Sequence, residues 1–318
     1  MTDVAPAIQF STLFEAIVDN IAHVVHGKHE TIEFAVVALL AEGHLLIEDV
    51  PGVGKTSLAK ALAASIHATH KRVQFTPDLL PADLLGVSVF ERSTETFRFQ
   101  RGPLFANIVL ADEINRASPK TQSALLEAME ERQVSADGTT YQLDAPFMVI
   151  ATQNPVEQEG TYRLPESQLD RFLLRISLGY PGRTAEMAIL DGQGSSEALR
   201  KLDPVVTTAE VLGMIEAVRS VYVAAALKSY LVDIAEASRR HPAIELGVSP
   251  RGTLQLAAAG RGLAAARGRD YATPDDVQTI APAVLAHRLM LRAGSNARTS
   301  AEDAVRELLA DVPVPVAR

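Results

Sequence analysis

One eight-residue segment of the chain has the residue types and the spacing that bind phosphate groups. It occupies residues 49–56 and reads Asp-Val-Pro-Gly-Val-Gly-Lys-Thr. The two glycines let backbone N–H groups surround phosphates, and a following helix would add its positive N-terminal end. In such a loop Lys55 reaches the β- and γ-phosphates, and the Thr56 hydroxyl ligates Mg²⁺. A simple turn rich in Gly and Pro is the alternative, which Gly-Lys-Thr between an expected strand and helix disfavours.

A second segment supplies the carboxylates that hydrolysis of a nucleotide needs. Residues 107–111 are almost entirely apolar, and Asp112 and Glu113 follow them directly. Asp112 is placed to hold Mg²⁺, directly or through water, and Glu113 to polarise a water for attack on the γ-phosphate. An apolar run that ends in Asp-Glu says little alone. Downstream of a phosphate-binding loop it indicates nucleotide hydrolysis.

Short apolar runs and helix-like segments alternate around both motifs. Apolar residues recur at helical spacing over residues 10–25, and residues 31–41 and 56–66 also read as helices. Strands are expected at residues 44–48, 73–75, 108–111, 147–151 and 173–176. Several of these strands are fully apolar, as in a parallel sheet that is covered on both faces. The alternation predicts an α/β sandwich that positions the two motifs.

The pattern changes after the Tyr-Pro-Gly sequence at residues 180–182. From Thr208 onward only helical patterns are visible, and the expected helix starts are Thr207 or Thr208, Ser249, Thr273 and Ser300. We therefore expect an ATP-binding core domain over residues 1–182 and an all-α domain over residues 183–318. The Gly-Ser stretch at 191–196 would be part of the junction.

Composition and charge exclude several classes of protein. The 318 residues are 47% hydrophobic and carry a net charge of −9, proportions that exclude a largely disordered chain. The absence of cysteine excludes a disulfide scaffold, a thiolate metal site and a cysteine nucleophile. The acidic balance disfavours a nucleic-acid partner, and no Asn-Lys-x-Asp sequence supports a GTPase. No secretory signal and no long apolar run is visible, so we expect a cytoplasmic protein without membrane insertion.

Six segments together resemble the MoxR family of AAA+ ATPases. They are residues 50–56, 74–81, 110–117, 126–131, 151–155 and 164–172. The resemblance extends from about Phe10 to the C-terminal tail. Asp49, where the general phosphate-loop pattern has glycine, is compatible with this family. The resemblance implies a P-loop AAA+ fold, a three-layer parallel-sheet sandwich followed by a small all-α lid. It also implies ATP and Mg²⁺ as cofactors, with the nucleotide held by Pro51, Gly52, Val53, Gly54, Lys55, Thr56 and Ser57.

The resemblance implies roles for several polar residues outside these motifs. Asn154 resembles sensor 1, which orients the attacking water. Arg171 resembles the arginine finger, which reaches the γ-phosphate bound in the neighbouring subunit, and Asp170 beside it would orient Arg171 or an interface contact. Arg251 resembles sensor 2, which reads the γ-phosphate of its own subunit. Arg163 is a rival of Arg171 for the role in trans.

Gly27 and two hairpin-like segments complete the expected site and its moving parts. Gly27 lies in a segment that resembles the lining of the adenine pocket, and it could equally be a helix C-cap. Alternating patterns around a polar turn predict β-hairpins at 86–102 and 132–143, the latter with an Asp-Gly turn. They match the insertions of the helix-2-insert AAA+ group. They would either face a ring pore and transmit nucleotide state or be surface hairpins without function.

The family implies a homo-oligomer, because an arginine that acts in trans requires a neighbour placed head to tail. The expected assembly is a hexameric ring, and the expected function is to remodel or mature a client protein. A partner with a von Willebrand factor A (VWA) domain is also implied. The ATPase subunit of a metal chelatase is the first alternative. A nucleic-acid motor or loader is the second, which the acidic charge disfavours.

Overall fold

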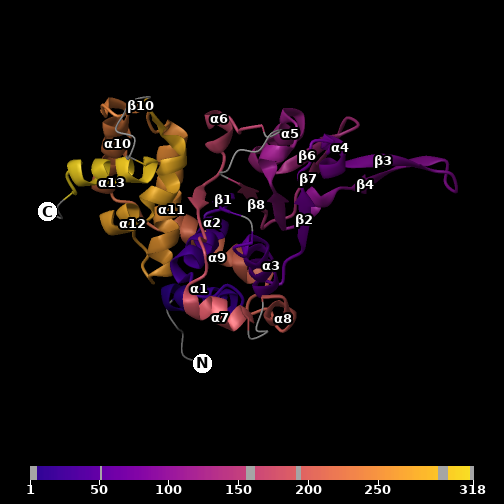
Figure 1. The fold of residues 1–318 in the computed structure, drawn as a ribbon, viewed down its shortest axis with the longest axis horizontal. Coiled ribbons are helices and arrows are strands. Elements are labelled where there is room, and N and C mark those ends of the chain that lie inside the picture. Colours follow the sequence, from indigo (N-terminus) through magenta and orange to yellow (C-terminus); the bar gives the residue numbers. More distant parts are fainter. Residues whose placement is uncertain (1–5, 51, 155–161, 191–194, 293–299, 316–318) are drawn as a thin grey trace.

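A parallel sheet of five strands forms the centre of the N-terminal part of the molecule. The computed structural model describes residues 6–50, 52–154, 162–190, 195–292 and 300–315. All neighbouring strands of this sheet run parallel (Figure 1). Their order is β2 (His70–Gln74), β5 (Ile108–Asp112), β8 (Met148–Gln153), β1 (Leu45–Glu48) and β9 (Leu174–Ile176). The sequence-based prediction of an α/β fold with a parallel sheet is confirmed.

Burial explains which strands the sequence located well. Every residue of β5 is buried, and β8 is buried up to its last residue, because these strands are apolar and central. Strand β2 is mostly exposed at the sheet edge and reads His-Lys-Arg-Val-Gln. Because the first residues of β2 are polar, they carry no hydrophobic signal, and the strand expected at 73–75 starts three residues too late. Phe75 is buried but follows the strand.

The two faces of the sheet are covered by different helices. Alternate residues of the central strands, such as Ile108 and Val109, belong to different apolar clusters, as the two-residue period of a strand requires. One face packs on α1 (Pro6–Ala22), α2 (His29–Leu40) and α3 (Lys55–Ser65). The other packs on α4 (Pro81–Leu85) and α5 (Pro119–Glu131). The result is the three-layer sandwich that the sequence predicts.

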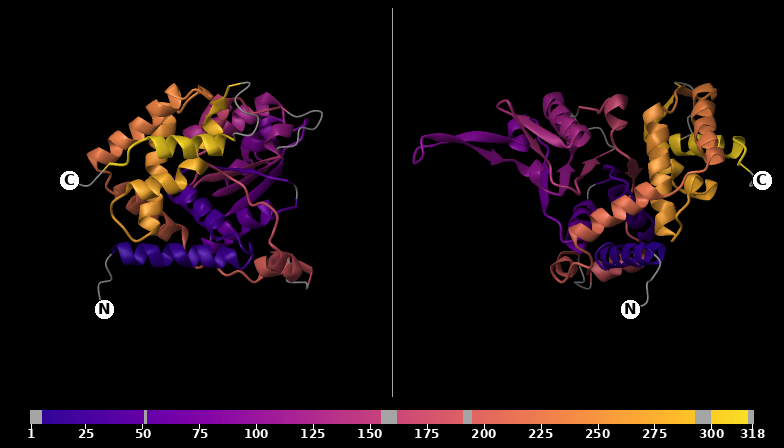
Figure 2. Two further views of the ribbon diagram at one scale, coloured as in Figure 1. Left: turned by 60° about the vertical axis from the view of Figure 1, so that its left-hand side comes forward. Right: turned by 180° about the vertical axis from the view of Figure 1, so that it is seen from behind.

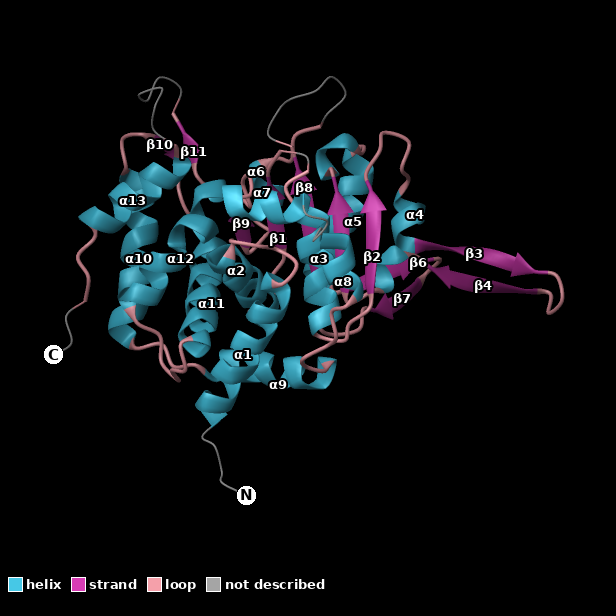
Figure 3. Cartoon of the chain, turned by 60° about the horizontal axis from the view of Figure 1, so that its bottom comes forward, coloured by secondary structure: helices cyan, strands magenta, loops and turns pink. Residues whose placement is uncertain are grey.

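Two antiparallel hairpins are inserted between the sheet elements. The first, β3 (Gly86–Glu91) with β4 (Thr96–Arg101), projects as a long ribbon away from the rest of the chain (Figure 3). The second pairs β6 (Gln133–Ala136) with β7 (Thr139–Gln142), and Asp137 and Gly138 both have positive φ in its turn. Short 3₁₀ turns flank β5, at η1 (Pro103–Phe105) and η2 (Ile114–Arg116).

The C-terminal part is a helical lid, which begins after the short helix α6 (Glu166–Leu169) and strand β9. The expected N-caps at Thr207, Ser249, Thr273 and Ser300 are confirmed, since each hydroxyl accepts a backbone N–H three residues later. The helices are α7 (Arg183–Leu190), α8 (Ser195–Arg200), α9 (Thr208–Ser220), α10 (Ala225–Arg240), α11 (Pro250–Ala266), α12 (Pro274–Leu285), η3 (Ala286–Arg288) and α13 (Ala301–Asp311). The expectation of helices alone missed two short paired strands, β10 (Ile244–Leu246) and β11 (Met290–Leu291).

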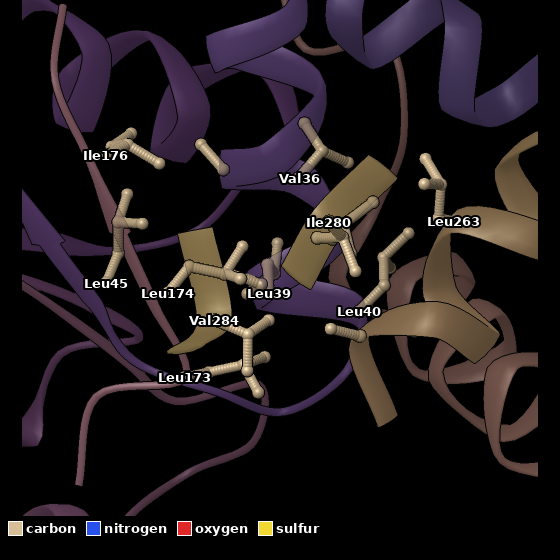
Figure 4. Close-up of a cluster of buried hydrophobic side chains, with 14 of the residues drawn as sticks. Val36, Leu39, Leu40, Leu45, Leu173, Leu174, Ile176, Leu263, Ile280 and Val284 are labelled. Atoms are coloured by element: carbon tan, nitrogen blue, oxygen red, sulfur yellow. The ribbon is translucent and has the colours of Figure 1, made fainter. Parts of the chain in front are cut away.

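The lid shares one apolar core with the sheet. Side chains from α2, β1 and β9 meet side chains from α11 and α12 in a single buried cluster (Figure 4). Gly262 of α11 lies so close to α2 that an added Cβ would be 2.9 Å from Val37 Cγ1. The lid is therefore packed beside the sandwich, against α2 and the edge strand β9, as Figure 2 shows from two further directions. The domain boundary at residue 182 stays a prediction.

Within the described residues, no helix is both long enough and apolar enough to cross a bilayer.

Candidate nucleotide-binding site

The phosphate-binding loop connects β1 to α3, as its residues predict. Gly52 and Gly54 have φ values of +87° and +99°, and an added Cβ at either position would meet no atom within 4 Å. Glycine is needed there for its left-handed backbone rather than for lack of space. Lys55 and Thr56 occupy the first turn of α3, where the backbone N–H groups have no acceptor within the helix and are suited to bind an anion. Pro51 lies outside the described residues.

Asp49 fixes the start of the loop through its carboxylate. Its Oδ2 atom accepts hydrogen bonds from the backbone N–H groups of Leu178 and Gly179, both at 2.7 Å, and from the Ser177 hydroxyl at 3.0 Å. Its backbone carbonyl accepts a hydrogen bond from Lys55 Nζ at 2.7 Å. From the sequence, aspartate at this position is only a tolerated departure from glycine. In the structure it ties the phosphate loop to the chain that follows β9.

A small pocket of about 70 Å³ lies beside the phosphate loop. Val53, Gly54 and Ser57 form one wall, and a segment around Val25 and His26 forms another. Gly27 belongs to this second segment, with a φ of +72°. Its alternative interpretation as a helix C-cap is wrong, because α1 already ends at Ala22.

Asp112 and Glu113 lie at the carboxyl edge of the sheet and share one buried hydroxyl. Thr152 Oγ1 on β8 donates to Asp112 Oδ1 at 2.6 Å and accepts from the Glu113 backbone N–H at 2.9 Å. Glu113 has a left-handed φ of 56°, which is uncommon for a residue other than glycine and is typical of functional sites. Its carboxylate is anchored by Arg116, with Nη1 to Oε2 at 2.9 Å. Thr152 therefore fixes the Asp112 carboxylate and the backbone of Glu113 relative to the sheet.

Arg72 on the neighbouring strand β2 is a second partner of Asp112. Its Nε and Nη2 atoms lie 3.1 and 2.6 Å from Asp112 Oδ2. Half of the Arg72 side chain is exposed, whereas that of Asp112 is largely buried. Both oxygens of Asp112 thus have partners, one a neutral hydroxyl and the other a cation.

The charges around Lys55 are suited to bind phosphate groups together with a divalent cation. Burial lowers the pKa of Lys55, and the carboxylates of Asp112, Asp49 and Glu113 oppose that shift. Hydroxyl and carboxylate oxygens are the ligands that Mg²⁺ prefers, and Thr56 and Asp112 supply both. The donor set of Thr56 and Asp112 therefore fits a Mg²⁺ ion.

Asn154 follows the last residue of β8 and is half-buried. The ends of β1, β5 and β8 meet at one edge of the sheet because the strands are parallel and adjacent. The structure thus brings Asn154 to the same edge as Asp112 and the phosphate loop. Ligands of parallel α/β sheets bind at this edge.

Arg171 and Arg251 meet at one glutamate on α5. Arg171 Nη1 lies 2.8 Å from Glu130 Oε2, and Arg251 Nη1 lies 3.1 Å from Glu130 Oε1. Arg171 also donates to the backbone carbonyl of Leu126 at 2.7 Å. Neither guanidinium contacts the phosphate loop of the same chain within the described residues. Arg163, the rival, is exposed.

Sequence reasoning overlooked several residues that organise this site. Thr152 and Glu130 lie inside the segments that carry the family resemblance, at 151–155 and 126–131, but received no role. Thr152 had a usable signal, since it is the polar residue that directly follows the apolar run at 147–151. Arg72 had none, because an arginine on an exposed strand is usually a solvated surface residue.

Comparison with known proteins agrees with this geometry. Residues 44–174 match the family model described as "ATPase family associated with various cellular activities (AAA)", and residues 236–308 match the AAA lid domain. The uncharacterized protein YeaC of Bacillus subtilis is 50% identical and covers 95% of this chain and 94% of its own length. Chaperone MoxR1 of Mycobacterium tuberculosis is 40% identical, over 97% of this chain and 84% of its own length.

A solved structure from Cytophaga hutchinsonii, assigned as an ATPase, superposes with a TM-score of 0.90. Its sequence is 34% identical, and the match covers 98% of this chain and 97% of that one. The parallel sheet, the lid and the phosphate loop with its acidic pair agree with these similarities along almost the whole chain. The chain therefore belongs to the MoxR family of AAA+ ATPases.

Proposed function

We propose that this chain hydrolyses Mg²⁺-bound ATP at the interfaces of a hexameric ring and uses the reaction to remodel or mature partner proteins. The observation that carries the proposal is the division of the expected catalytic groups. Lys55, Thr56, Asp112 and Glu113 belong to one edge of the sheet, whereas Arg171 and Arg251 are paired at Glu130. A site divided in this way is completed by a second copy of the chain.

In the first half of the site, the chain's own groups bind and orient the nucleotide. Backbone N–H groups at the start of α3 and the Lys55 ammonium bind the phosphates. Thr56 and Asp112 would hold Mg²⁺, which neutralises charge on the phosphate oxygens when it is bound. Glu113 and Asn154 orient a water, and Glu113 accepts its proton as the water attacks the γ-phosphate. Thr152 keeps the Asp112 carboxylate and the backbone of Glu113 in place for this step.

In the second half, arginines stabilise the charge that develops on the γ-phosphate of the neighbouring subunit. Arg171 takes this role in trans. Because Arg251 shares Glu130 with Arg171, we propose that Arg251 also acts on the neighbour's nucleotide. The expectation that Arg251 acts as sensor 2 and reads the γ-phosphate of its own subunit stays the alternative.

Contact with a client is assigned to the projecting β3–β4 hairpin. Phe97 is 74% exposed and pairs with Phe90 across the ribbon, with ring centroids 5.2 Å apart. Exposed aromatic side chains at the end of a ribbon can bind unfolded or extended segments of a protein. A client protein, a VWA-domain partner and a cytoplasmic location are parts of this proposal that rest on the family.

The proposal is tested by ATP hydrolysis and nucleotide affinity of two variants. Lys55→Ala should lose both binding and hydrolysis of ATP. Glu113→Gln should retain ATP, because its partners Thr152 and Arg116 stay available, and should lose turnover by about 10²- to 10⁴-fold. Glu131→Gln, an exposed glutamate at the end of α5, is the control that should hydrolyse ATP normally. Normal turnover by Glu113→Gln would refute the assigned base.

The function in the cell is tested by capture on the ATP-bound Glu113→Gln protein. The proposal predicts that a VWA-domain protein or its client stays bound with ATP and is released when ATP is absent. Loss of tetrapyrrole metallation in an assay that depends on this chain would instead favour a chelatase subunit. ATP turnover stimulated by DNA would favour a nucleic-acid motor.

A further inference from the structure

A buried arginine, Arg288, joins the lid to the segment that carries Arg171. Arg288 is only 4% exposed and lies in η3, directly after α12. Its Nε atom lies 2.8 Å from Asp170 Oδ1, and its guanidinium also donates to the backbone carbonyls of Asp170 and Phe172. The same group donates to the Val284 carbonyl and the Gln255 side chain in the lid. One side chain thus satisfies acceptors on both sides of the residue proposed as the arginine finger.

A second link runs from Asp170 to the start of α11. Asp170 Oδ2 accepts a hydrogen bond from the Ser249 hydroxyl at 3.1 Å. Ser249 is the N-cap of α11, and Arg251 is two residues further along that helix. Asp170 therefore contacts η3 through one carboxylate oxygen and α11 through the other. The residue that precedes the proposed finger therefore connects η3 with the N-terminus of α11.

The charge state of this network favours a fixed arrangement. Burial lowers the pKa of Arg288 to about 10, against the opposing effect of Asp170, so the guanidinium stays charged at neutral pH. A buried cation that loses its carboxylate partner is strongly destabilising. Separation of the lid from the segment 170–173 would remove that partner. The lid and the finger segment therefore move together rather than independently.

We propose that Arg288 is a positioning residue, which with Asp170 and Ser249 ties the lid to Arg171 and holds this finger toward the neighbouring subunit's nucleotide. The inference rests on the proposed function in trans of Arg171. It adds that the lid of a subunit controls the site of its neighbour through Arg288. Neither the Arg288 contacts nor this coupling is needed for the subunit's own phosphate loop.

The test measures ATP hydrolysis by mixtures of inactive variants. Arg288→Gln alone should lose about 100-fold in kcat, the loss that a misplacement of about 1 Å can cause. Its affinity for ATP should be unchanged, because its own phosphate loop is intact. Mixed with Lys55→Ala, it should regain activity, since the Lys55→Ala subunit supplies an intact finger. About one quarter of the sites in a random equimolar ring would be complete.

Two reference mixtures separate this inference from the proposed function. Arg171→Ala with Lys55→Ala should regain activity if Arg171 acts in trans, and failure of that mixture would refute the proposed function. Arg288→Gln with Arg171→Ala should stay inactive, because both changes damage the same half of the site. If the first reference mixture regains activity but Arg288→Gln with Lys55→Ala does not, Arg288 has a general structural role and the inference is overturned. Activity in the second reference mixture would overturn it too.

Further variants keep the result interpretable if Arg288→Gln folds poorly. Arg288→Lys keeps a cation beside Asp170 but loses the guanidinium's hydrogen bonds to the Asp170 and Phe172 carbonyls, and it should behave in every mixture as Arg288→Gln does. Arg269→Gln is a matched control, because Arg269 pairs with the fully buried Asp276 elsewhere in the lid. It should lower lid stability yet keep kcat within about twofold. An equal loss of kcat in Arg269→Gln would show that lid damage alone explains the effect.

Discussion

The phosphate-loop half of the site, Lys55 and Thr56 with Asp112 and Glu113, lies at one edge of a single sheet. The arginine half gathers Glu130 from α5, Asp170 and Arg171 after α6, and Arg251 and Arg288 from the lid. Figure 2 shows α6 between α5 and α11, where these three parts of the chain meet. The first half is built by short motifs that follow strands. The arginine half forms only when elements that are distant in sequence pack together. Its geometry therefore depends on the position of the lid.

The largest effect that separates the two halves is expected from Arg171→Ala. Loss of an arginine finger costs about 10³- to 10⁵-fold in kcat, while ATP binding depends on the intact phosphate loop. This variant should therefore lose ATP hydrolysis while its affinity for ATP stays nearly unchanged. Arg163→Ala is the matched control and should keep most of its turnover. If Arg163→Ala lost turnover and Arg171→Ala did not, the arginine half would be wrongly assigned.

Acid should destabilise the fold, because two deeply buried histidines bond to backbone carbonyls beside the arginine half. His44 bonds to the Met129 carbonyl, next to Glu130, and His287 to the Phe172 carbonyl, next to Arg171. Burial, with a smaller effect of nearby arginines, lowers the pKa of His44 to about 4 from its ordinary value. The unfolded chain therefore binds the proton first, and stability falls as the pH drops below about 6.5.

This pH effect can be measured by chemical denaturation at pH 7.5 and pH 5. His44 alone should contribute a loss of about 2 kcal/mol in the free energy of unfolding over that interval. His44→Gln can still donate to Met129 and accept from the Val149 N–H, but it does not titrate. Its stability should depend less on pH by that amount. An unchanged pH dependence would show that His44 is not protected in the folded state.

A smaller effect, confined to the phosphate-loop half, is expected from Thr152→Val. The change removes the hydroxyl that bridges Asp112 and the Glu113 N–H, at a cost of about 1–3 kcal/mol for unsatisfied buried groups. The kcat should fall about tenfold, which corresponds to ~1.4 kcal/mol in the barrier. Thr121→Val is the control, since Thr121 is equally buried and donates to the Leu79 carbonyl at 2.7 Å. If Thr121→Val lost as much turnover as Thr152→Val, the specific role assigned to Thr152 would be refuted.

The phosphate-loop half could be predicted because its signals are local. Gly-Lys-Thr needs only a strand before it and a helix after it, and Asp112-Glu113 needs only an apolar strand. The same local rules located the helix caps at Ser249 and Thr273. They failed at β2, where the polar residues of an edge strand carry no hydrophobic signal.

The arginine half could not be predicted in full because it depends on tertiary contacts between residues that are far apart in the sequence. The family resemblance identified Arg171 and Arg251, but nothing in the sequence shows that both pair with Glu130. Arg288 stands in an ordinary Ala-His-Arg sequence, and only its burial between the lid and residues 170–173 reveals its partners. The two short lid strands were missed for a similar reason, since two or three residues are too few for a periodic pattern.

The most direct test of the divided site is the ATPase activity of an equimolar mixture of Lys55→Ala and Arg171→Ala. Each variant alone should be inactive, because every interface lacks either the phosphate-binding lysine or the finger. In a mixed ring about one quarter of the interfaces combine an intact loop with an intact arginine, so activity should return. A mixture as inactive as its two components, in assembled rings, would contradict the account and place the whole site within one chain.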